Sequence, residues 1–418
     1  MAGTPRVLRA MNDRAALDLL LEHGPLSRTR LGRLTGLSKP TASQLLARLE
    51  AAGLVVATGT GADGPRDGGP GEDGSGRRGS GTGRPGPNAQ LYAVDPTAAY
   101  AAGLDVTPER VLAAVADITG RTVGEHAVPT PGRRPAEPVV RQVTTALDGA
   151  IKAAGLTRSD VRRTVIGTPG AFDPTTGRLR YASHLPGWHS PTLLDELAAA
   201  LPMPVEYEND VNLAALAEQR LGAAKGHDDF VLLWNEGGLG AAVVLGGRLH
   251  RGFTGGAGEV GFLPVPGVPL VRQVTKANSG GFQELAGSQI IPRLARELGI
   301  SPIPDGSYTE VAAAVVARAA ADIDAAPHRQ LLATYATGVA TGLAALVTVL
   351  DPELIVLSGS ALISGGEPLR ALVEAELGEL AASRPRLVLG AVLEHPVLRG
   401  ALESALAATR DEVFDTSR

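Results

Sequence analysis

The chain has no cysteine and few aromatic residues, and it lacks long apolar runs. None of its 418 residues is cysteine, which excludes disulfide bonds and metal sites built on thiolates. No stretch of roughly twenty purely apolar residues occurs. The closest, residues 335–350, is interrupted by threonine and glycine and is predicted to be a buried helix. The N-terminus has no apolar segment followed by a small-residue cleavage site, so we expect a cytoplasmic protein without a membrane span.

Charge is distributed unevenly along the chain, whose formal net charge is −5. Residues 1–58 carry eight arginines and lysines against four acidic residues, a balance of +4, so the rest of the chain has a balance of −9. A basic segment joined to an acidic body predicts a polyanion partner for that segment alone.

Three short helices and a strand are predicted in this basic segment. Asn12, Ser27 and Ser38 each precede apolar residues at helical spacing and are expected to cap the helices. Residues 54–57 then begin a strand. This order predicts a winged helix-turn-helix. The alternative is a three-helix structural or dimerisation module with a solvated basic face.

The third helix is expected to meet DNA with the side chains that its apolar face leaves outside. Its apolar positions recur at helical spacing and are predicted to lie inside, where they cannot contact DNA. The outward positions can reach phosphates and base edges, and Gln44 and Arg48 among them are expected to be dispensable for folding. The predicted DNA contacts are Ser38, Lys39, Thr41, Ser43, Gln44 and Arg48.

Glycine is concentrated in residues 59–88, which contain twelve. Such a segment cannot bury enough apolar surface to fold, so it is predicted to be a flexible wing or linker. The head is then expected to comprise residues 1–58 plus 84–95, with a returning strand at 89–94. Arg84 is a candidate for a minor-groove contact, although a plain linker arginine fits the pattern equally well.

Two stretches of the body combine acidic or amide side chains with sharp turns. The first, PVEYENDVNLAALAE, ends a predicted strand in Asn209 and Asp210 before an alanine-rich helix. The second, GGLGAAVVLGGRLHRGFTGGAGEVGF, places Glu259 on a glycine-rich bend, where a backbone can approach a ligand closely. From the residues alone, the first pair can also be a helix cap and the glycines plain hairpin turns.

Together these stretches resemble the ROK family of repressors and sugar kinases. The resemblance covers residues 96–412 and implies an α/β fold of two actin-like, ribonuclease H-like lobes that close over a sugar. The smaller lobe is expected at residues 96–208 plus 398–418, and the larger lobe at 209–397. Asp210 matches the catalytic base of the kinases. The positions that match the family's sugar-binding residues are Gly170, Asn209, Asp210, Glu259 and Glu284.

The chain departs from the kinase pattern at positions that serve catalysis. After Asp105 the kinases have a glycine-rich phosphate loop, whereas residues 106–109 here read VTPE. Proline removes a backbone donor, and glutamate places negative charge near the phosphates. Phe262 stands where the family has a zinc-binding histidine, and the zinc cysteines are absent. We therefore expect no nucleotide cofactor, no metal and no kinase activity.

The leading hypothesis is a DNA-binding transcriptional regulator, most simply a repressor, that responds to a sugar or sugar derivative. A homodimer or homotetramer is expected, because two-fold assemblies match pseudo-palindromic operators in double-stranded DNA. The alternative is an ATP-dependent sugar kinase, with Asp210 as its base, that carries a DNA-binding head. A third possibility is a regulator whose cleft has lost ligand binding altogether.

Overall fold

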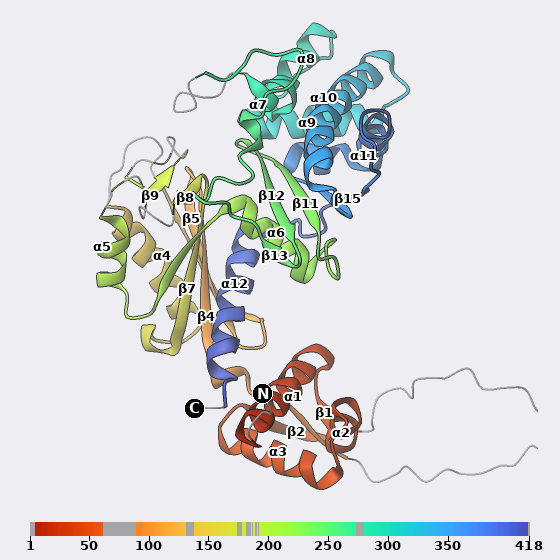
Figure 1. Ribbon diagram of the computed structural model, residues 1–418. Helices are drawn as coiled ribbons and strands as arrows, with labels where there is room; N and C mark the ends of the chain where they lie inside the picture. The colour runs from red at the N-terminus through yellow and green to blue at the C-terminus, as the bar shows by residue number, and fades with distance from the viewer. Residues whose placement is uncertain are drawn as a thin grey trace, which may run out of the picture.

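The computed structural model describes residues 5–61, 89–130, 138–173, 178–180, 192–272 and 280–416, with Leu185, Gly187, Trp188 and Ser190 between them. Figure 1 shows three units in this part of the chain: a head at the N-terminus and two lobes, each built on its own sheet. The described elements confirm the predicted α/β fold with an N-terminal winged helix-turn-helix.

The head packs three helices against a small antiparallel sheet. Its strands lie in the order β1-β3-β2, so β3 returns between the other two. Apolar side chains of all three helices share one core with the sheet. The elements are α1 (Pro5–His23), β1 (Leu26–Ser27), α2 (Arg28–Thr35), α3 (Lys39–Ala51), β2 (Val55–Gly61) and β3 (Ala89–Val94).

One predicted cap in the head is wrong, and part of the wing lies outside the described residues. Helix α1 begins at Pro5 and runs straight through Asn12, because the residues before Asn12 include good helix formers and nothing there stops the helix. Ser27 and Ser38 do cap α2 and α3. Of the glycine-rich segment, residues 59–61 belong to β2. Residues 62–88, with Arg84 among them, are outside the described residues.

The two lobes repeat one sheet connectivity. In each, the first three strands form an antiparallel meander, and the last two add in parallel beside the first strand. The first lobe has the order β10-β7-β4-β5-β6 and the second β13-β12-β11-β14-β15. Parallel strands end at a common edge of their sheet, and ligands of open α/β sheets bind outside that edge.

Helix α6 (Asp210–Leu221) follows β10 and packs against both lobes. The elements of the first lobe are β4 (Tyr100–Val106), β5 (Arg110–Asp117), β6 (Thr122–Pro129), α4 (Val139–Ala153), β7 (Val161–Thr168), β8 (Ala171–Asp173), β9 (Arg178–Arg180), α5 (Leu193–Ala200), β10 (Val205–Asn209) and the returning α12 (Pro396–Val413). Those of the second are β11 (Phe230–Asn235), β12 (Leu239–Leu245), β13 (Arg248–Leu249), α7 (Gly281–Ala286), α8 (Ile291–Glu297), α9 (Tyr308–Ala321), α10 (Ala326–Leu350), β14 (Leu354–Ser358), α11 (Ser360–Leu380) and β15 (Arg386–Leu389). Short 3-10 turns include η1 (Pro96–Ala98), η2 (Arg158–Asp160), η3 (Val260–Phe262) and η5 (Ser288–Ile290).

Helix α10 is the apolar helix that contains the predicted buried segment. In the described part of the chain it alone is long and apolar enough, by length and composition, to cross a membrane. It packs against α9 and α11 and buries Leu332, Val339 and Leu343 in the core of the second lobe. We therefore interpret α10 as a core helix.

Candidate effector cleft and DNA-binding head

Three carboxyl groups come together where the two lobes meet. Asp105 lies near the end of β4, and Asp210 is the first residue of α6, directly after β10. Glu259 precedes η3 on the bend of the second lobe. Asp105 and Glu259 both act electrostatically on Asp210, so residues distant in the sequence are neighbours here, as the sequence predicted for Asp210 and Glu259.

Burial makes all three carboxyls unusually weak acids. It raises the pKa of Asp210 to about 7, with repulsion from Asp105 and Glu259 adding to the effect. Burial alone raises the pKa of Glu259 to about 7. It raises the pKa of Asp105 to about 6, although Arg110 and His395 oppose the change. Perturbed carboxyls in a cleft are typical of a functional site. No group of three or more His, Asp or Glu side chains in the described ranges is arranged to hold a metal ion.

Glycine is required on the bend that carries Glu259. Gly258 has φ +95°, and a Cβ there would lie 1.9 Å from the carbonyl oxygen of Ala241. A Cβ on Gly255, with φ +77°, would lie 2.1 Å from the carbonyl oxygen of Phe172, in the first lobe. Side chains at either position would push the bend out of place. The glycines therefore let the bend that holds Glu259 pack against both lobes.

Asn209 joins the start of α6 to the turn at Gly170. Its Nδ2 donates to the carbonyl oxygen of Gly170 at 3.1 Å, and its Oδ1 accepts from the backbone N–H of Asn212 at 3.1 Å. Asn209 is thus a helix cap, the alternative that the sequence left open. Gly170 (φ +90°) and Asn209 do lie beside Asp210. Their direct contact with a sugar stays a prediction.

Glu284 lies on α7 of the second lobe, and its carboxylate pairs with Arg293 at 3.1 Å. Its contact with a sugar, like that of the other four predicted residues, stays a prediction. The preceding residue, Gln283, contacts the second lobe near the bend: its Oε1 accepts from the backbone N–H of Leu239 at 2.6 Å and lies 3.3 Å from where a Cβ on Gly261 would be. Neighbouring helical residues point about 100° apart, so the motif that contains Glu284 does not show where the side chain of Gln283 points. The sequence prediction therefore did not include Gln283.

The turn after Asp105, expected to be a poor phosphate loop, uses its own backbone donors. The Oγ1 of Thr107 accepts from the backbone N–H groups of Glu109 at 3.3 Å and of Arg110 at 3.2 Å. The backbone N–H of Thr130 donates to the carbonyl oxygen of Glu109 at 2.8 Å. A phosphate needs such N–H groups pointing outward. Those of Glu109 and Arg110 are directed to Thr107.

A carboxylate also occupies the N-terminus of α11. Glu236 accepts from the backbone N–H of Ser360 at 2.6 Å and from its hydroxyl at 2.5 Å. Helix N-termini are ready-made anion sites, and this one already holds an anion of the protein. Tyr308 donates to the carbonyl oxygen of Gly237 at 2.6 Å, and Glu236 and Glu109 both raise the pKa of Tyr308 after burial, the larger cause. Glu236 and Glu109 therefore both lie near Tyr308.

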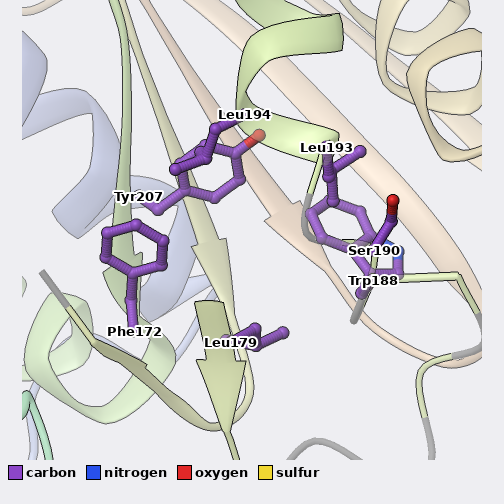
Figure 2. A pocket seen from close by; sticks show the side chains of 7 residues that line it. All are labelled: Phe172, Leu179, Trp188, Ser190, Leu193, Leu194 and Tyr207. Atoms are coloured by element: carbon purple, nitrogen blue, oxygen red, sulfur yellow. The ribbon is translucent and has the colours of Figure 1, made fainter. Parts of the chain in front are cut away.

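A small aromatic pocket lies in the first lobe and is lined in part by Phe172, Trp188 and Tyr207 (Figure 2). The rings of Phe172 and Tyr207 stack with centroids 5.7 Å apart, and Trp188 meets Tyr207 edge-on. In the described part of the chain the Tyr207 hydroxyl has no hydrogen-bond partner. Tyr207 precedes Asn209 by two residues on β10, so both point to the same face of the sheet. Aromatic faces can pack on the C–H surfaces of sugars. The sequence prediction did not include this pocket, although Tyr207 within the first motif was an available signal.

Helix α3 presents most of the predicted DNA contacts to solvent. Lys39, Thr41 and Gln44 are exposed and Ser43 is half-buried. The Ser38 Oγ accepts from the backbone N–H of Thr41 and so caps the helix. The apolar side of α3 is buried, as predicted.

Arg48 differs from the other predicted DNA contacts. Its guanidinium donates to the carboxylate of Asp13 on α1 at 2.6 Å, and Asp13 is only 3% exposed. Removing Arg48 would leave the buried carboxylate of Asp13 with one fewer hydrogen-bond donor to offset its desolvation. This contact argues that Arg48 contributes to the stability of the head, contrary to the expectation that it is dispensable for folding. That role and a DNA contact by its exposed part both stay predictions.

Comparison with known proteins then decides the family, because residues 101–405 match the ROK family. The chain belongs to the ROK family. Residues 11–64 match the MarR family, over the head that contains the winged helix. A MarR-type winged helix-turn-helix thus precedes a ROK body in one chain.

The relatives of this chain include both repressors and sugar kinases. A putative xylose repressor of Caldicellulosiruptor sp. (strain Rt8B.4) is 25% identical over 380 residues, which cover 89% of either chain. A glucokinase of Streptomyces coelicolor is 26% identical over 62% of this chain and 80% of its own. Among solved structures, a ROK family transcriptional regulator described as a homologue of the E. coli MLC protein shares the fold across 98% of both chains, with a TM-score of 0.70 and 19% identity. A ROK hexokinase from Thermus thermophilus matches 75% of this chain and 99% of its own, with a TM-score of 0.62 and 29% identity.

Proposed function

We propose that this protein is a sugar-responsive transcriptional repressor whose ROK cleft binds its effector without phosphorylating it. The observation that best supports the proposal is that one chain contains both a DNA-binding head and a body with buried carboxyl groups. An exposed helix-turn-helix precedes a cleft that keeps Asp210 and Glu259, while Glu236 and Thr107 occupy the donors that a nucleotide needs. The relative named xylose repressor aligns with 89% of the chain.

The effector of this cleft is proposed to be a neutral sugar, and D-xylose and D-glucose are the first candidates. Relatives carry the names xylose repressor and glucokinase. Thermal unfolding with a panel of sugars tests this step, since a ligand at a hundredfold excess over its Kd stabilises the folded protein by about 2.7 kcal/mol. A Glu259→Ala variant should lose that stabilisation. If no sugar stabilises the wild type, the cleft has lost ligand binding and the head acts without an effector.

The kinase alternative rests on one observation: Asp210 has a pKa of about 7. A general base works best when its pKa lies near the ambient pH. The pKa of Asp210 therefore suits abstraction of a proton from a sugar hydroxyl. Coupled measurement of ADP release over the same sugar panel separates the two functions. Turnover that disappears in Asp210→Asn would replace the regulator-only proposal by a bifunctional one.

Operator binding is proposed for the exposed surface of α3. Fluorescence anisotropy with DNA from upstream of the protein's own coding region tests it, and Lys39→Ala should weaken binding and lower the salt dependence by about one ion. The matched control is Lys152→Ala, an exposed lysine on α4 of the body. Equal affinities of the two variants would remove Lys39 from the interface. A cytoplasmic homodimer or homotetramer is part of the same proposal, because palindromic operators pair with two-fold assemblies.

A further inference from the structure

Helix α12 runs from the region where the two lobes meet to the head (Figure 1). Its 18 residues span about 27 Å. At the cleft end the capping residue is His395, with a left-handed backbone (φ +48°). The Nδ1 of His395 lies 3.2 Å from the Nη2 of Arg110, and both residues act electrostatically on the cleft carboxylate of Asp105. The helix therefore begins at the site proposed to bind the effector.

Along its middle, α12 touches the backbone of two cleft elements with no side chain between them. A Cβ on Gly400 would lie 1.8 Å from the carbonyl oxygen of Leu213 on α6, the helix that Asp210 begins. A Cβ on Gly103 of β4 would lie 2.9 Å from the backbone nitrogen of Leu402. Because these backbones are close-packed, with no space between them, a displacement of α6 or β4 also displaces α12.

Just beyond its C-terminal end, the chain enters the head. Phe414 is 1% exposed and belongs to the core of the head, together with Leu17 and Leu20 of α1. Asp411 accepts from the guanidinium of Arg14 at 2.8 Å, and that guanidinium lies over the Phe414 ring, 5.7 Å from its centre. The last turn of the ROK body is thus bound to the first helix of the head.

One buried carboxylate then continues the chain of contacts to the DNA-binding helix. The Oδ2 of Asp13 accepts from the hydroxyl of Thr416 at 3.1 Å, and its Oδ1 accepts from Arg48 of α3 at 2.6 Å. Asp13 is 3% exposed, whereas the Arg48 side chain is 42% exposed, so the two bonds lie at the edge of the core of the head. The C-terminus and the DNA-binding helix therefore share a single acceptor.

We propose that α12, through Asp411, Phe414 and Thr416, is the connection by which effector binding in the cleft sets the orientation of the DNA-binding head. The inference rests on the proposed function, since it requires an effector in the cleft. A ligand that draws the lobes together displaces α6 and β4, and α12 transmits this displacement to Asp13 and so to Arg48. A ligand changes the head only if it binds the two orientations with different affinity.

The test removes the polar contacts of the connection and keeps its apolar anchor. The double variant Asp411→Asn with Thr416→Val retains Phe414, and Glu412→Gln, exposed on the same turn of α12, is the matched control. For each protein the operator Kd is measured by anisotropy with and without 10 mM D-xylose or D-glucose, and sugar binding is measured separately by calorimetry. We expect the sugar to change the operator Kd of the wild type and the control by at least about fivefold. For the double variant we expect less than half that ratio, with unchanged sugar affinity.

A double variant that binds sugar and keeps the ratio of the wild type overturns the inference. If neither sugar binds the wild type, the proposed effector class fails, and a second measurement still decides the inference. His395→Ala disturbs the cleft end of α12 without any ligand. It should alter amide hydrogen exchange in α1 and α3, and this effect should be lost when the double variant is added. Unaltered exchange in α1 and α3 rejects the connection even when no sugar is known.

Discussion

Replacing Glu259 by glutamine should stabilise the ligand-free protein at alkaline pH and abolish its response to sugar. Burial raises the pKa of Glu259 from the ordinary 4.5 to about 7, so ionising it costs up to about 3 kcal/mol. Glu259 keeps some solvent exposure, which screens part of this cost, and we expect a gain of about 1–2 kcal/mol at pH 8. Glutamine has nearly the same shape and carries no charge to desolvate.

The pH dependence follows from the direction of the pKa change. Because the folded-state pKa lies above the unfolded one, the favourable contribution of Glu259 is fully present below about pH 4.5 and is lost as the pH rises through about 7. The advantage of Glu259→Gln should therefore be small near pH 5 and largest near pH 8. Thermal unfolding at both pH values measures it, with Tm rising by about 2–4 °C per kcal/mol for a lobe of this size.

Glu284→Gln is the matched control, since Glu284 is also a glutamate of the second lobe but its charge is paired with Arg293. A partly exposed pair of this kind contributes about 0–1 kcal/mol, so the control should be neutral or slightly less stable at both pH values. An equal gain in both variants, or a gain that does not depend on pH, would refute the argument that burial destabilises the ionised form of Glu259.

Four further substitutions test other contacts. Arg48→Ala should lower the free energy of unfolding by about 1–3 kcal/mol because a buried carboxylate loses its partner, whereas Gln44→Ala should weaken operator binding at unchanged stability; the reverse pattern in thermal unfolding and anisotropy would contradict this. Glu236→Ala removes the acceptor at the start of α11 and should cost about 0.5–2 kcal/mol in urea unfolding; no loss would mean that the helix start is satisfied otherwise. Gly400→Ala places a methyl group 1.8 Å from a backbone oxygen of α6 and should cost at least about 1–3 kcal/mol; wild-type stability would show that α12 can shift freely.

The sequence predicts features whose cause is local. Ser27 and Ser38 cap helices because a hydroxyl reaches a backbone N–H three residues on. The buried face of α3 follows from the spacing of its apolar residues. The bend that carries Glu259 was predictable because the chain can take that path only with glycines there.

Features that depend on distant partners could not be predicted in this way. Arg48 is bound to Asp13, 35 residues earlier, and no periodicity in α3 reveals that carboxylate. The rotation of α7 about its axis decides which of its side chains contacts β12. Gln283 makes that contact and Glu284 pairs with Arg293, and the sequence motif alone does not show this rotation. Asn12 failed as a cap because capping residues are tolerated inside a helix when the preceding residues favour helix.

The presence of Phe414 in the core of the head limits how these proteins can be recombined. That core also contains Ala99, before β4, and Ile118, directly after β5, so residues 1–95 do not supply all of its apolar side chains. Chimeras that exchange the N-terminal segment between two regulators should therefore also exchange the final turn of the chain. A head from another regulator, grafted without its own C-terminal turn, would have to pack against Phe414 of this chain, for which its core has no matching space.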